Sequence, residues 1–289
     1  MGLRINNNIA AQNAYRNLSV TDSQMSKSLE KLSSGYRINR AADDAAGLSI
    51  SEGLRSQIGG LKVAVRNAQD GISVVQTAEG ALTETHSILQ RMRDLSVQAA
   101  STGSQDSDAR SAAQTEFAQL NKELDRIATT TAFGGQKLLD LGTNSSTGFT
   151  GIFQVGANSS DADQISVDLT ATAFGAVTAV SGFDSIGLGV STLDLSTAGT
   201  AAISAIDTAI KGVSTARATL GAYQNRFEHT INNLNVAVEN LSASESRIRD
   251  TDMAQEMVSF TRSQILTQAG TSMLAQANQA PQNVLSLLR

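Results

Sequence analysis

Adjacent carboxylates at Asp43 and Asp44 are the residues whose type and spacing come closest to a site for acid–base chemistry. Two carboxyl groups side by side can act as general acid and general base. Aspartate is also a common helix N-cap, where its charge is favourable to the helix dipole. Arg37 and Arg40 are near enough in sequence to pair with these charges. We therefore favour a helix cap over a catalytic pair.

Two histidines and a pair of glycines are the other candidates for chemistry. His86 lies in an apolar seam seven residues after Glu79, and a polar residue in such a seam is typical of a position that fixes helix register. His229 has no evident partner, and two histidines without any cysteine make a metal site improbable. The segment Gly134-Gly135-Gln136-Lys137 lacks the spacing of a phosphate-binding loop and indicates a turn. We expect no catalytic residue, no metal ligand and no cofactor.

The composition excludes several classes of protein. Among 289 residues, 22 Lys and Arg face 27 Asp and Glu, and a net charge of −5 argues against a nucleic-acid binder. Zero cysteines exclude disulfides, and aromatics at 4% are too scarce for a core of large rings. No segment has the continuous apolar length of a membrane span. The N-terminus lacks the apolar region of a Sec signal, so we expect a cytoplasmic protein or export by another route.

Three segments carry apolar residues at alternating steps of three and four, the period of about 3.5 residues that indicates coiled-coil helices. The first comprises Leu54, Ile58, Leu61, Val65, Ala68, Ile72, Val75, Glu79, Leu82, His86 and Leu89. The second comprises Ala109, Ala113, Phe117, Leu120, Leu124 and Ile127. The third comprises Ile203, Ile206, Ile210, Val213, Arg217, Leu220, Gln224, Phe227, Ile231, Leu234, Val238, Leu241, Glu245 and Ile248. Ser104 or Asp106 caps the second helix, and a turn at 101–104 makes the first two an antiparallel hairpin.

Both ends of the chain repeat the pattern more weakly. Near the start the apolar positions are Leu18, Met25, Leu29, Leu32 and Tyr36, and Gly35 indicates a helix stop. Near the end, Met253, Met257 and Phe260 share one face, while Val258, Ile265, Ala269 and Met273 share a neighbouring one. Asp250-Thr251-Asp252 indicates a helix N-cap. Pro281 is predicted to end the last helix before an apolar run at 284–288.

The middle of the chain, residues 141–200, is rich in Gly, Ser, Thr, Asp and Ala. Residues 152–155 and 165–169 have the composition of strands, and the turn residues of 156–161 separate them. We predict a β-hairpin there, and the sequence up to about residue 195 is ambiguous.

The terminal helices pose a physical problem, because an isolated amphipathic helix is marginal in water. Pairing the two covers part of each apolar stripe, but several faces of the C-terminal helix are apolar, so we expect burial against other copies. Head-to-tail contacts that do not close produce filaments, although a closed bundle stays open as an alternative. We further expect the termini to be disordered in the monomer and to fold on assembly.

Several segments resemble bacterial flagellins closely. They are LEKLSSGYRINRAADDAAGLSISEGLRSQI (29–58), NAQDGISVVQTAEGALTETHSILQRMRDLSVQA (67–99), FGGQKLL (133–139), IFQVGAN (152–158) and SRIRDTDMAQEMVSFTRSQILTQAGTSMLAQANQAPQNVLSLLR (246–289). The resemblance covers about 1–170 and 200–289. It implies a structural, non-enzymatic subunit of the extracellular flagellar filament, short enough to lack large outer domains. The alternative is a hook–filament junction protein, which shares related termini; a helical enzyme would need a cluster of titratable groups that we do not find.

The resemblance also implies a mainly α fold and a division of the chain. We expect paired terminal helices of the inner tube (1–42 and 250–289), a coiled-coil-like bundle (43–140 and 201–249) and a β-hairpin with a short exposed insert (141–200). Family export uses the flagellar type III apparatus, which fits the missing Sec signal. The implied partners are other copies of the chain, a chaperone on the C-terminal helix, the export apparatus, and the junction and cap proteins.

Two groups of site residues follow. The apolar residues of the terminal helices should carry polymerisation: Ile5, Ile9, Leu18, Met25, Leu29, Leu32, Met257, Phe260, Ile265, Leu274, Val284, Leu285, Leu287 and Leu288. Residues 90–97 are similar to the flagellin segment recognised by the vertebrate Toll-like flagellin receptor. On that resemblance Arg91, Leu95 and Glu116 map onto the contact positions of the family.

Overall fold

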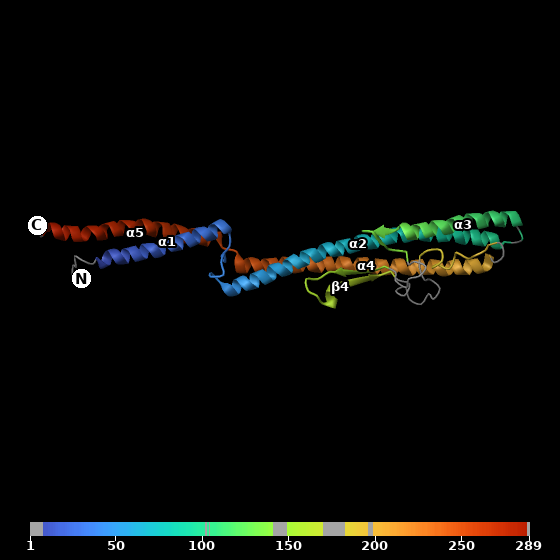
Figure 1. The fold of residues 1–289 in the computed structure, drawn as a ribbon, viewed down its shortest axis with the longest axis horizontal. Helices are drawn as coiled ribbons and strands as arrows, with labels where there is room; N and C mark the ends of the chain where they lie inside the picture. The colour runs from blue at the N-terminus through green and yellow to red at the C-terminus, as the bar shows by residue number, and fades with distance from the viewer. Residues whose placement is uncertain are drawn as a thin grey trace. The chain divides into compact units, whose positions relative to one another are not determined.

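The computed structural model describes residues 8–101, 103, 105–140, 149–169, 183–195 and 199–287, with the backbone alone for 280–287. The chain divides into two compact units, one formed by residues 1–57 and 239–289 and the other by residues 58–238. Within the described residues five long helices dominate: α1 (Ile9–Ser34), α2 (Ala45–Ala100), α3 (Ser107–Thr130), α4 (Gly199–Arg249) and α5 (Met253–Leu287). Figure 1 shows α1 and α5 side by side, and α3 and α4 alongside α2. The predicted mainly α fold with paired terminal helices is confirmed.

The aspartates predicted as caps begin their helices. Asp44 Oδ1 accepts a hydrogen bond from the amide of Gly47 at 2.8 Å, in the first turn of α2. Asp43 accepts from the amides of Arg40 and Asn39, which hold the pKa of its carboxyl below the ordinary value. Both carboxylates are therefore occupied by backbone donors in the turn before α2, and the structural interpretation is confirmed.

The other helix ends follow the same logic. Asp106 accepts from the amide of Ala109 at 2.7 Å and caps α3, whereas Ser104, the alternative cap, lies outside the described residues. Asp252 caps α5 by accepting from Ala254 at 2.9 Å. Gly35 ends α1 at a φ of 75°, a conformation that glycine adopts without strain.

The core of residues 58–238 follows the heptads, with one systematic difference. Ala68, Val75, Leu82 and Leu89 are buried as predicted. The positions between them are offset: α2 buries Gly71, Ala78 and Thr85, one residue before the predicted Ile72, Glu79 and His86, which are half-buried. In α4, Ala209 and Ala216 are likewise buried in place of Ile210 and Arg217. Small residues thus occupy every second layer, which lets the helices approach closely.

Gly71 shows why a small residue is needed. A Cβ built there would lie 2.7 Å from Cζ of Phe227 on α4, too close for any side chain without movement. The Phe227 ring also packs edge-on against Phe153 of β3, with 5.5 Å between centroids. One aromatic ring therefore joins α2, α4 and the β-hairpin.

Ion pairs link the bundle helices at the edges of the core. Arg93 of α2 donates to Asp207 of α4 at 2.6 Å, and this bond raises the pKa of the Arg93 guanidinium. Arg217 of α4 lies 3.7 Å from Glu79 of α2. Two polar positions of the predicted seams, Glu79 and Arg217, therefore pair with one another beside the apolar layers. Such exposed pairs specify register more than they stabilise the bundle.

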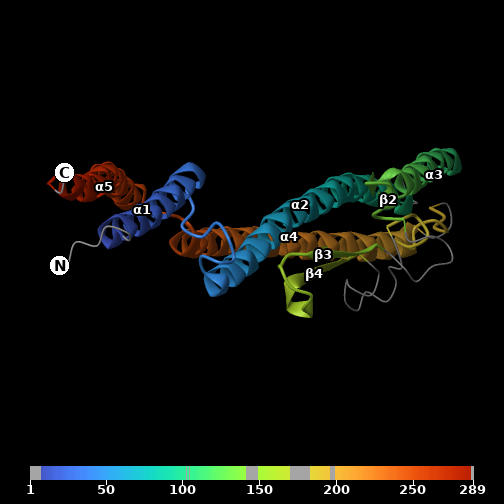
Figure 2. The same cartoon turned by 60° about the vertical axis from the view of Figure 1, so that its left-hand side comes forward.

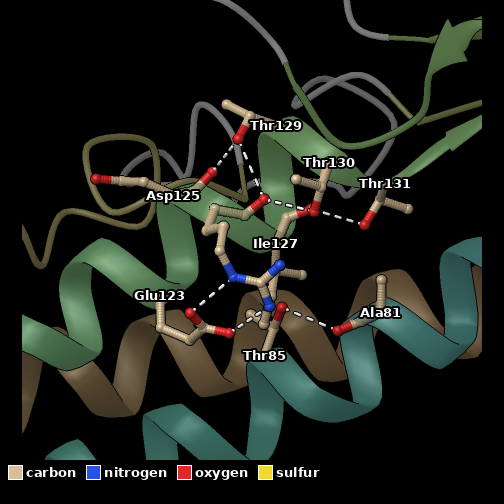
Figure 3. Close-up of polar contacts among 9 residues, drawn as sticks. Ala81, Thr85, Glu123, Asp125, Ile127, Thr129, Thr130 and Thr131 are labelled. Carbon is tan, nitrogen blue, oxygen red and sulfur yellow. Dashed lines mark hydrogen bonds and ion pairs between the residues drawn. The ribbon is translucent and has the colours of Figure 1, made fainter.

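The C-terminal end of α3 is closed by a run of threonines (Figure 3). The hydroxyls of Thr129 and Thr130 donate to carbonyls one turn earlier, and Thr131 donates to the Ile127 carbonyl at 2.6 Å. On α2, the buried Thr85 hydroxyl similarly donates to the Ala81 carbonyl at 3.0 Å. These bonds satisfy the hydroxyls within their own helices, and the Ile127 carbonyl also accepts from the amide of Thr131 at 3.0 Å.

Two short antiparallel hairpins follow α3. Strands β1 (Ala132–Phe133) and β2 (Gln136–Lys137) enclose Gly134 and Gly135, whose φ values of 58° and 85° make the predicted turn a tight hairpin. Strands β3 (Thr150–Gln154) and β4 (Gln164–Asp168) form the predicted β-hairpin, with a 3₁₀ turn at Asp161–Asp163 between them. Figure 2 shows the β3–β4 hairpin beside α4.

The returning segment 183–195 packs along α3. Ser185 donates its amide to Asp125 at 2.8 Å, and Leu195 donates to Gln114 at 2.8 Å. The buried side chains of this segment are Phe183, Ser185, Leu188, Val190 and Leu195. We expected an exposed insert over 141–200, and its described residues at 183–195 instead contribute to the core.

One prediction about the last helix is wrong. We expected Pro281 to end it, but α5 continues to Leu287. A proline inside a helix costs a hydrogen bond to the residue four positions earlier, here Ala277. The Ala277 carbonyl accepts the side-chain amide of Asn8 at 2.7 Å. A donor from α1 thus replaces the bond that proline removes, and the helix persists.

Candidate assembly surface

The faces on which α1 and α5 meet mix small and polar residues with a few larger apolar ones. The half-buried or buried positions on α1 are Ala11, Ala14, Leu18, Thr21, Met25, Ser28, Glu30, Lys31 and Leu32. Those on α5 are Glu256, Ser259, Phe260, Ser263, Thr267, Gly270, Leu274 and Ala277. The fully buried side chains among these are the small Ser28 and Ser263, and the larger apolar ones stay half-buried. Pairing therefore removes only part of their apolar area from water.

Most large apolar side chains of the two helices point outward instead. Their exposed fractions lie between 48% and 66%. The residues are Ile9, Tyr15, Val20 and Leu29 on α1, and Met253, Met257, Val258, Ile265, Leu266 and Met273 on α5. On α5, Met257, Val258, Ile265 and Leu266 line one groove, and a grouped exposed apolar surface of this kind marks an interaction site.

The outward surface holds two shallow grooves of different character. One, of about 460 Å³, lies on α5 and is lined by Met257, Val258, Thr261, Arg262, Ile265 and Leu266. The other, of about 690 Å³, runs along α1 and α5 and is lined by Ala11, Gln12, Tyr15, Arg16, Ser19, Val20, Leu274 and Asn278. The first is almost wholly apolar, whereas the second mixes apolar and polar side chains.

The predicted polymerisation residues fall into three groups. Ile9, Leu29, Met257 and Ile265 lie on the outward surface. Leu18, Met25, Leu32, Phe260 and Leu274 are half-buried between the two helices. Ile5 and Leu288 lie outside the described residues, as do the side chains of Val284, Leu285 and Leu287, although the backbone of the last three is helical.

Sequence reasoning omitted several outward residues. Tyr15, Val20, Val258, Leu266 and Met273 are exposed as fully as the residues that were included. Val258 and Met273 were placed on a neighbouring apolar face but not among the polymerisation residues, and Tyr15, Val20 and Leu266 lie off the seams. The signal that finds them is a large apolar residue outside the seam of a terminal helix.

A polar joint connects the terminal helices to α2 and α4. The segment after α1 and the segment before α5 pair as a short antiparallel bridge. The backbone amide of Arg37 donates to the Arg249 carbonyl at 2.7 Å, and the backbone amide of Thr251 donates to the Gly35 carbonyl at 3.0 Å. The Arg249 guanidinium lies 4.8 Å from the centre of the Tyr36 ring. These bonds tie both connections into one junction.

Arg249 also reaches α2 at this joint. Its Nη1 donates to Glu52 Oε1 at 2.6 Å, and this hydrogen bond holds the pKa of Glu52 below the ordinary value. A lowered carboxyl pKa means that the contact stabilises the joint above the ordinary pKa of glutamate and is lost as the pH falls through the lowered value.

The three residues mapped to the receptor segment are not equivalent. Arg91 of α2 donates to Glu116 of α3 at 2.7 Å, and both side chains are about half exposed. Leu95 is only 3% exposed and lies in the core. The surface here therefore offers a charged pair, with Leu95 beneath it.

The described residues carry neither a metal cluster nor a membrane span. No group of three or more His, Cys, Asp or Glu side chains is placed to hold a metal ion in this part of the chain. His86 Nε2 instead lies 3.0 Å from the side-chain nitrogen of Gln90. Over the same residues, no helix combines the length and apolarity needed to cross a membrane.

Two known protein families match this chain over most of its length. The bacterial flagellin N-terminal helical region matches residues 5–144, and the bacterial flagellin C-terminal helical region matches residues 203–288. The chain belongs to the flagellin family. The first region spans α1 to α3 and the second spans α5 and nearly all of α4, so the family features are those of the helices described above.

Relatives match nearly end to end. The flagellin of Bacillus subtilis is 51% identical over 99% of this chain and 100% of its own length. The flagellin of Halalkalibacterium halodurans is 54% identical over 99% of both chains. Among solved structures, Bacillus cereus flagellin is 30% identical, with a TM-score of 0.47 over 58% of this chain and 88% of that chain. Flagellins are structural proteins. The match to them indicates that this chain is a subunit of a flagellar filament.

Proposed function

We propose that this chain polymerises head-to-tail into the extracellular bacterial flagellar filament that drives swimming. The observation that carries the proposal is the outward apolar face of α5, at Met257, Val258, Ile265, Leu266 and Met273, which the molecule itself leaves uncovered. Other copies of the same chain are the occupants that this face is built for. The nearly end-to-end match of the chain to two flagellins supports a filament subunit over a hook–filament junction protein.

The head-to-tail geometry is supported by the difference between the two grooves. A closed two-fold dimer places the same patch of each copy against itself, whereas an open filament joins two unlike patches. The groove on α5 is apolar, and the groove that includes Tyr15 and Val20 of α1 is partly polar. Two unlike grooves suit contacts that repeat without closing.

The terminal helices order on assembly. Their mutual interface fully buries the small Ser28 and Ser263, which are 7% exposed, but leaves the larger apolar side chains only half-buried, so its hydrophobic stabilisation is incomplete. Ordering a chain segment costs about 1–2 kcal/mol per residue. Contacts with neighbouring copies supply the free energy that the isolated pair lacks.

The parts of the chain have separate roles in this filament. The helices of 1–42 and 250–289 form the inner tube. The bundle of 43–140 and 201–249 forms the next shell, together with the segment 183–195 that packs on it. Secretion uses the flagellar export apparatus. A chaperone covers the apolar face of the C-terminal helix before export, and the junction and cap proteins contact the ends of the filament.

Substitutions on the outward face of α5 test the polymerisation surface. Ile265→Gln with Leu266→Gln removes two exposed apolar side chains without touching the α1 face. Burial of each contributes about 1.5–3 kcal/mol, so we expect the critical concentration for filament formation to rise at least about 100-fold. Sedimentation and electron microscopy measure it.

The matched control is Ile265→Val with Leu266→Met, which keeps both side chains apolar. This variant should polymerise close to the parent concentration. Equal polymerisation of the glutamine and control variants would show that this face stays in water within the filament, and would contradict the proposal.

A second proposal concerns host recognition. The charged pair of Arg91 and Glu116 is exposed on free subunits and is a contact for the Toll-like flagellin receptor. Leu95, being buried, acts by holding this part of α2 in place. The proposal is supported by the similarity of residues 90–97 to the recognised segment.

Loss of the Arg91 charge should remove receptor activation by monomer. We expect Arg91→Ala to be inactive in a reporter assay, because the guanidinium supplies both the charge and the directed donors of the contact. Arg126→Ala is the control, since Arg126 is also half exposed and paired, with Glu123. Equal activation by the two variants would contradict the assignment.

A further inference from the structure

Pro281 leaves the Ala277 carbonyl of α5 without its helical partner. In an α-helix each carbonyl accepts from the amide four residues later, and proline has no N–H to give. Ala277 is half-buried on the face that meets α1. An unpaired carbonyl at such a place is costly, because water cannot fully replace the lost bond.

Asn8 supplies that missing donor from the other end of the sequence. Its Nδ2 donates to the Ala277 carbonyl at 2.7 Å, and its Oδ1 accepts from the Ala11 amide at 3.1 Å. The side-chain amide of Asn8 thus has two functions. The oxygen caps the start of α1, and the nitrogen binds the carbonyl exposed by the proline in α5.

The α1–α5 interface needs such a contact because its packing selects register only weakly. The side chains that it buries fully, Ser28 and Ser263, are too small to interlock, and the larger apolar ones are only half-buried. Three specific contacts mark the register: Asn8 with Ala277, Leu18 over Gly270, and the 3.8 Å ion pair of Lys31 with Glu256. Of these three contacts, the one made by Asn8 is a hydrogen bond, which depends on direction as well as distance.

We propose that Asn8 is a positioning residue that fixes the register of α1 against α5, and that Pro281 creates the acceptor that makes this contact selective. The groove lined by Tyr15 and Val20 of α1 with Leu274 and Asn278 of α5 exists only in that register. A slip of α1 would dismantle it. The expected effect on filament formation rests on the proposed function, whereas the role of Asn8 in the register rests on its hydrogen bond to Ala277.

The decisive experiment is a double-mutant cycle between Asn8 and Pro281. Asn8→Ser keeps a good helix cap but loses the donor that reaches Ala277. In the parent chain we expect it to raise the critical concentration of polymerisation about tenfold. In a Pro281→Ala background, where residue 281 can donate to Ala277 itself, we expect less than about a twofold rise.

Disulfide trapping reports the register directly, since the chain contains no cysteine. A Cβ at position 270 would lie 3.9 Å from that of Leu18, within the range of a disulfide. Leu18→Cys with Gly270→Cys should therefore cross-link under mild oxidation, in the free chain at high concentration and in filaments. Leu18→Cys with Ser263→Cys, one heptad out of register, is the control. Adding Asn8→Ser should shift cross-linking from the first pair toward the second.

The outcomes separate this inference from the proposed function. An equal effect of Asn8→Ser with and without Pro281 would reduce Asn8 to a helix cap, and unchanged cross-linking would contradict the register role. Failure of the parent chain to polymerise would overturn the proposed function, while the cross-linking result would still decide the role of Asn8.

Discussion

A chain that ends at Asp252 should form no filaments at any attainable concentration, yet residues 58–238 should stay folded. Removing α5 deletes most of the outward apolar face and leaves α1 without its helical partner. The core of residues 58–238 loses nothing, because its buried residues come from α2, α3, α4, the hairpin segments and the segment 183–195. Electron microscopy and thermal unfolding by circular dichroism measure the two effects.

The truncated chain should unfold at the same midpoint as the full-length monomer. Such a result would show that loss of polymerisation does not arise from loss of the bundle. Filaments formed by the truncated chain would mean that α5 is dispensable for assembly, and would contradict the assignment of the polymerisation surface.

A valine at position 71 should destabilise the bundle by about 3 kcal/mol relative to a valine at position 80. Both glycines lie in α2, so the helix propensity change is the same at each. A Cβ at Gly71 would meet the Phe227 ring at 2.7 Å, whereas one at Gly80 would have no atom within 4 Å. The difference isolates the overpacking between α2 and α4.

Thermal unfolding of the monomer measures this difference. For a unit of this size, 3 kcal/mol corresponds to a shift in Tm of about 6–12 °C. Gly71→Val should show that loss, and Gly80→Val should match or exceed the parent. Equal midpoints for the two variants would mean that Phe227 can move aside freely, and that the small-residue layers do not determine the helix spacing.

The spacing of the heptads was predictable from the sequence. The sequence did not predict that every second core layer is shifted by one residue. Hydrophobicity favours Ile72 and Ile210 for burial, whereas the molecule buries Gly71 and Ala209. Close helix approach depends on what faces a position on the partner, such as the ring of Phe227 above Gly71. That information is absent from the pattern of a single helix.

The course of α5 past Pro281 was unpredictable for a similar reason. Local chemistry says that a proline ends a helix, and the sequence offers no sign that a residue near the other end replaces the bond. Asn8 and Ala277 are 269 positions apart. By contrast, the aspartate caps depend on neighbours two or three residues away, and these were predictable.

The sequence predicts an apolar surface on the terminal helices, but it predicts only some of the residues that form this surface. An apolar stripe on each terminal helix identified Ile265 and Met257 correctly as apolar residues at the surface. It placed Leu18 and Leu274 in the same class, although they lie half-buried between α1 and α5. Which side of a helix faces its partner depends on packing, and this pair places small residues and a few larger apolar ones between its helices.

Amide hydrogen exchange tests most directly whether neighbouring copies complete the terminal helices. In the free chain, kept below its polymerising concentration, we expect α1 and α5 to exchange rapidly while α2, α3 and α4 within residues 58–238 are protected. In filaments all five helices should be protected. Strong protection of α1 and α5 in the dilute free chain, equal to that in filaments, would contradict the account.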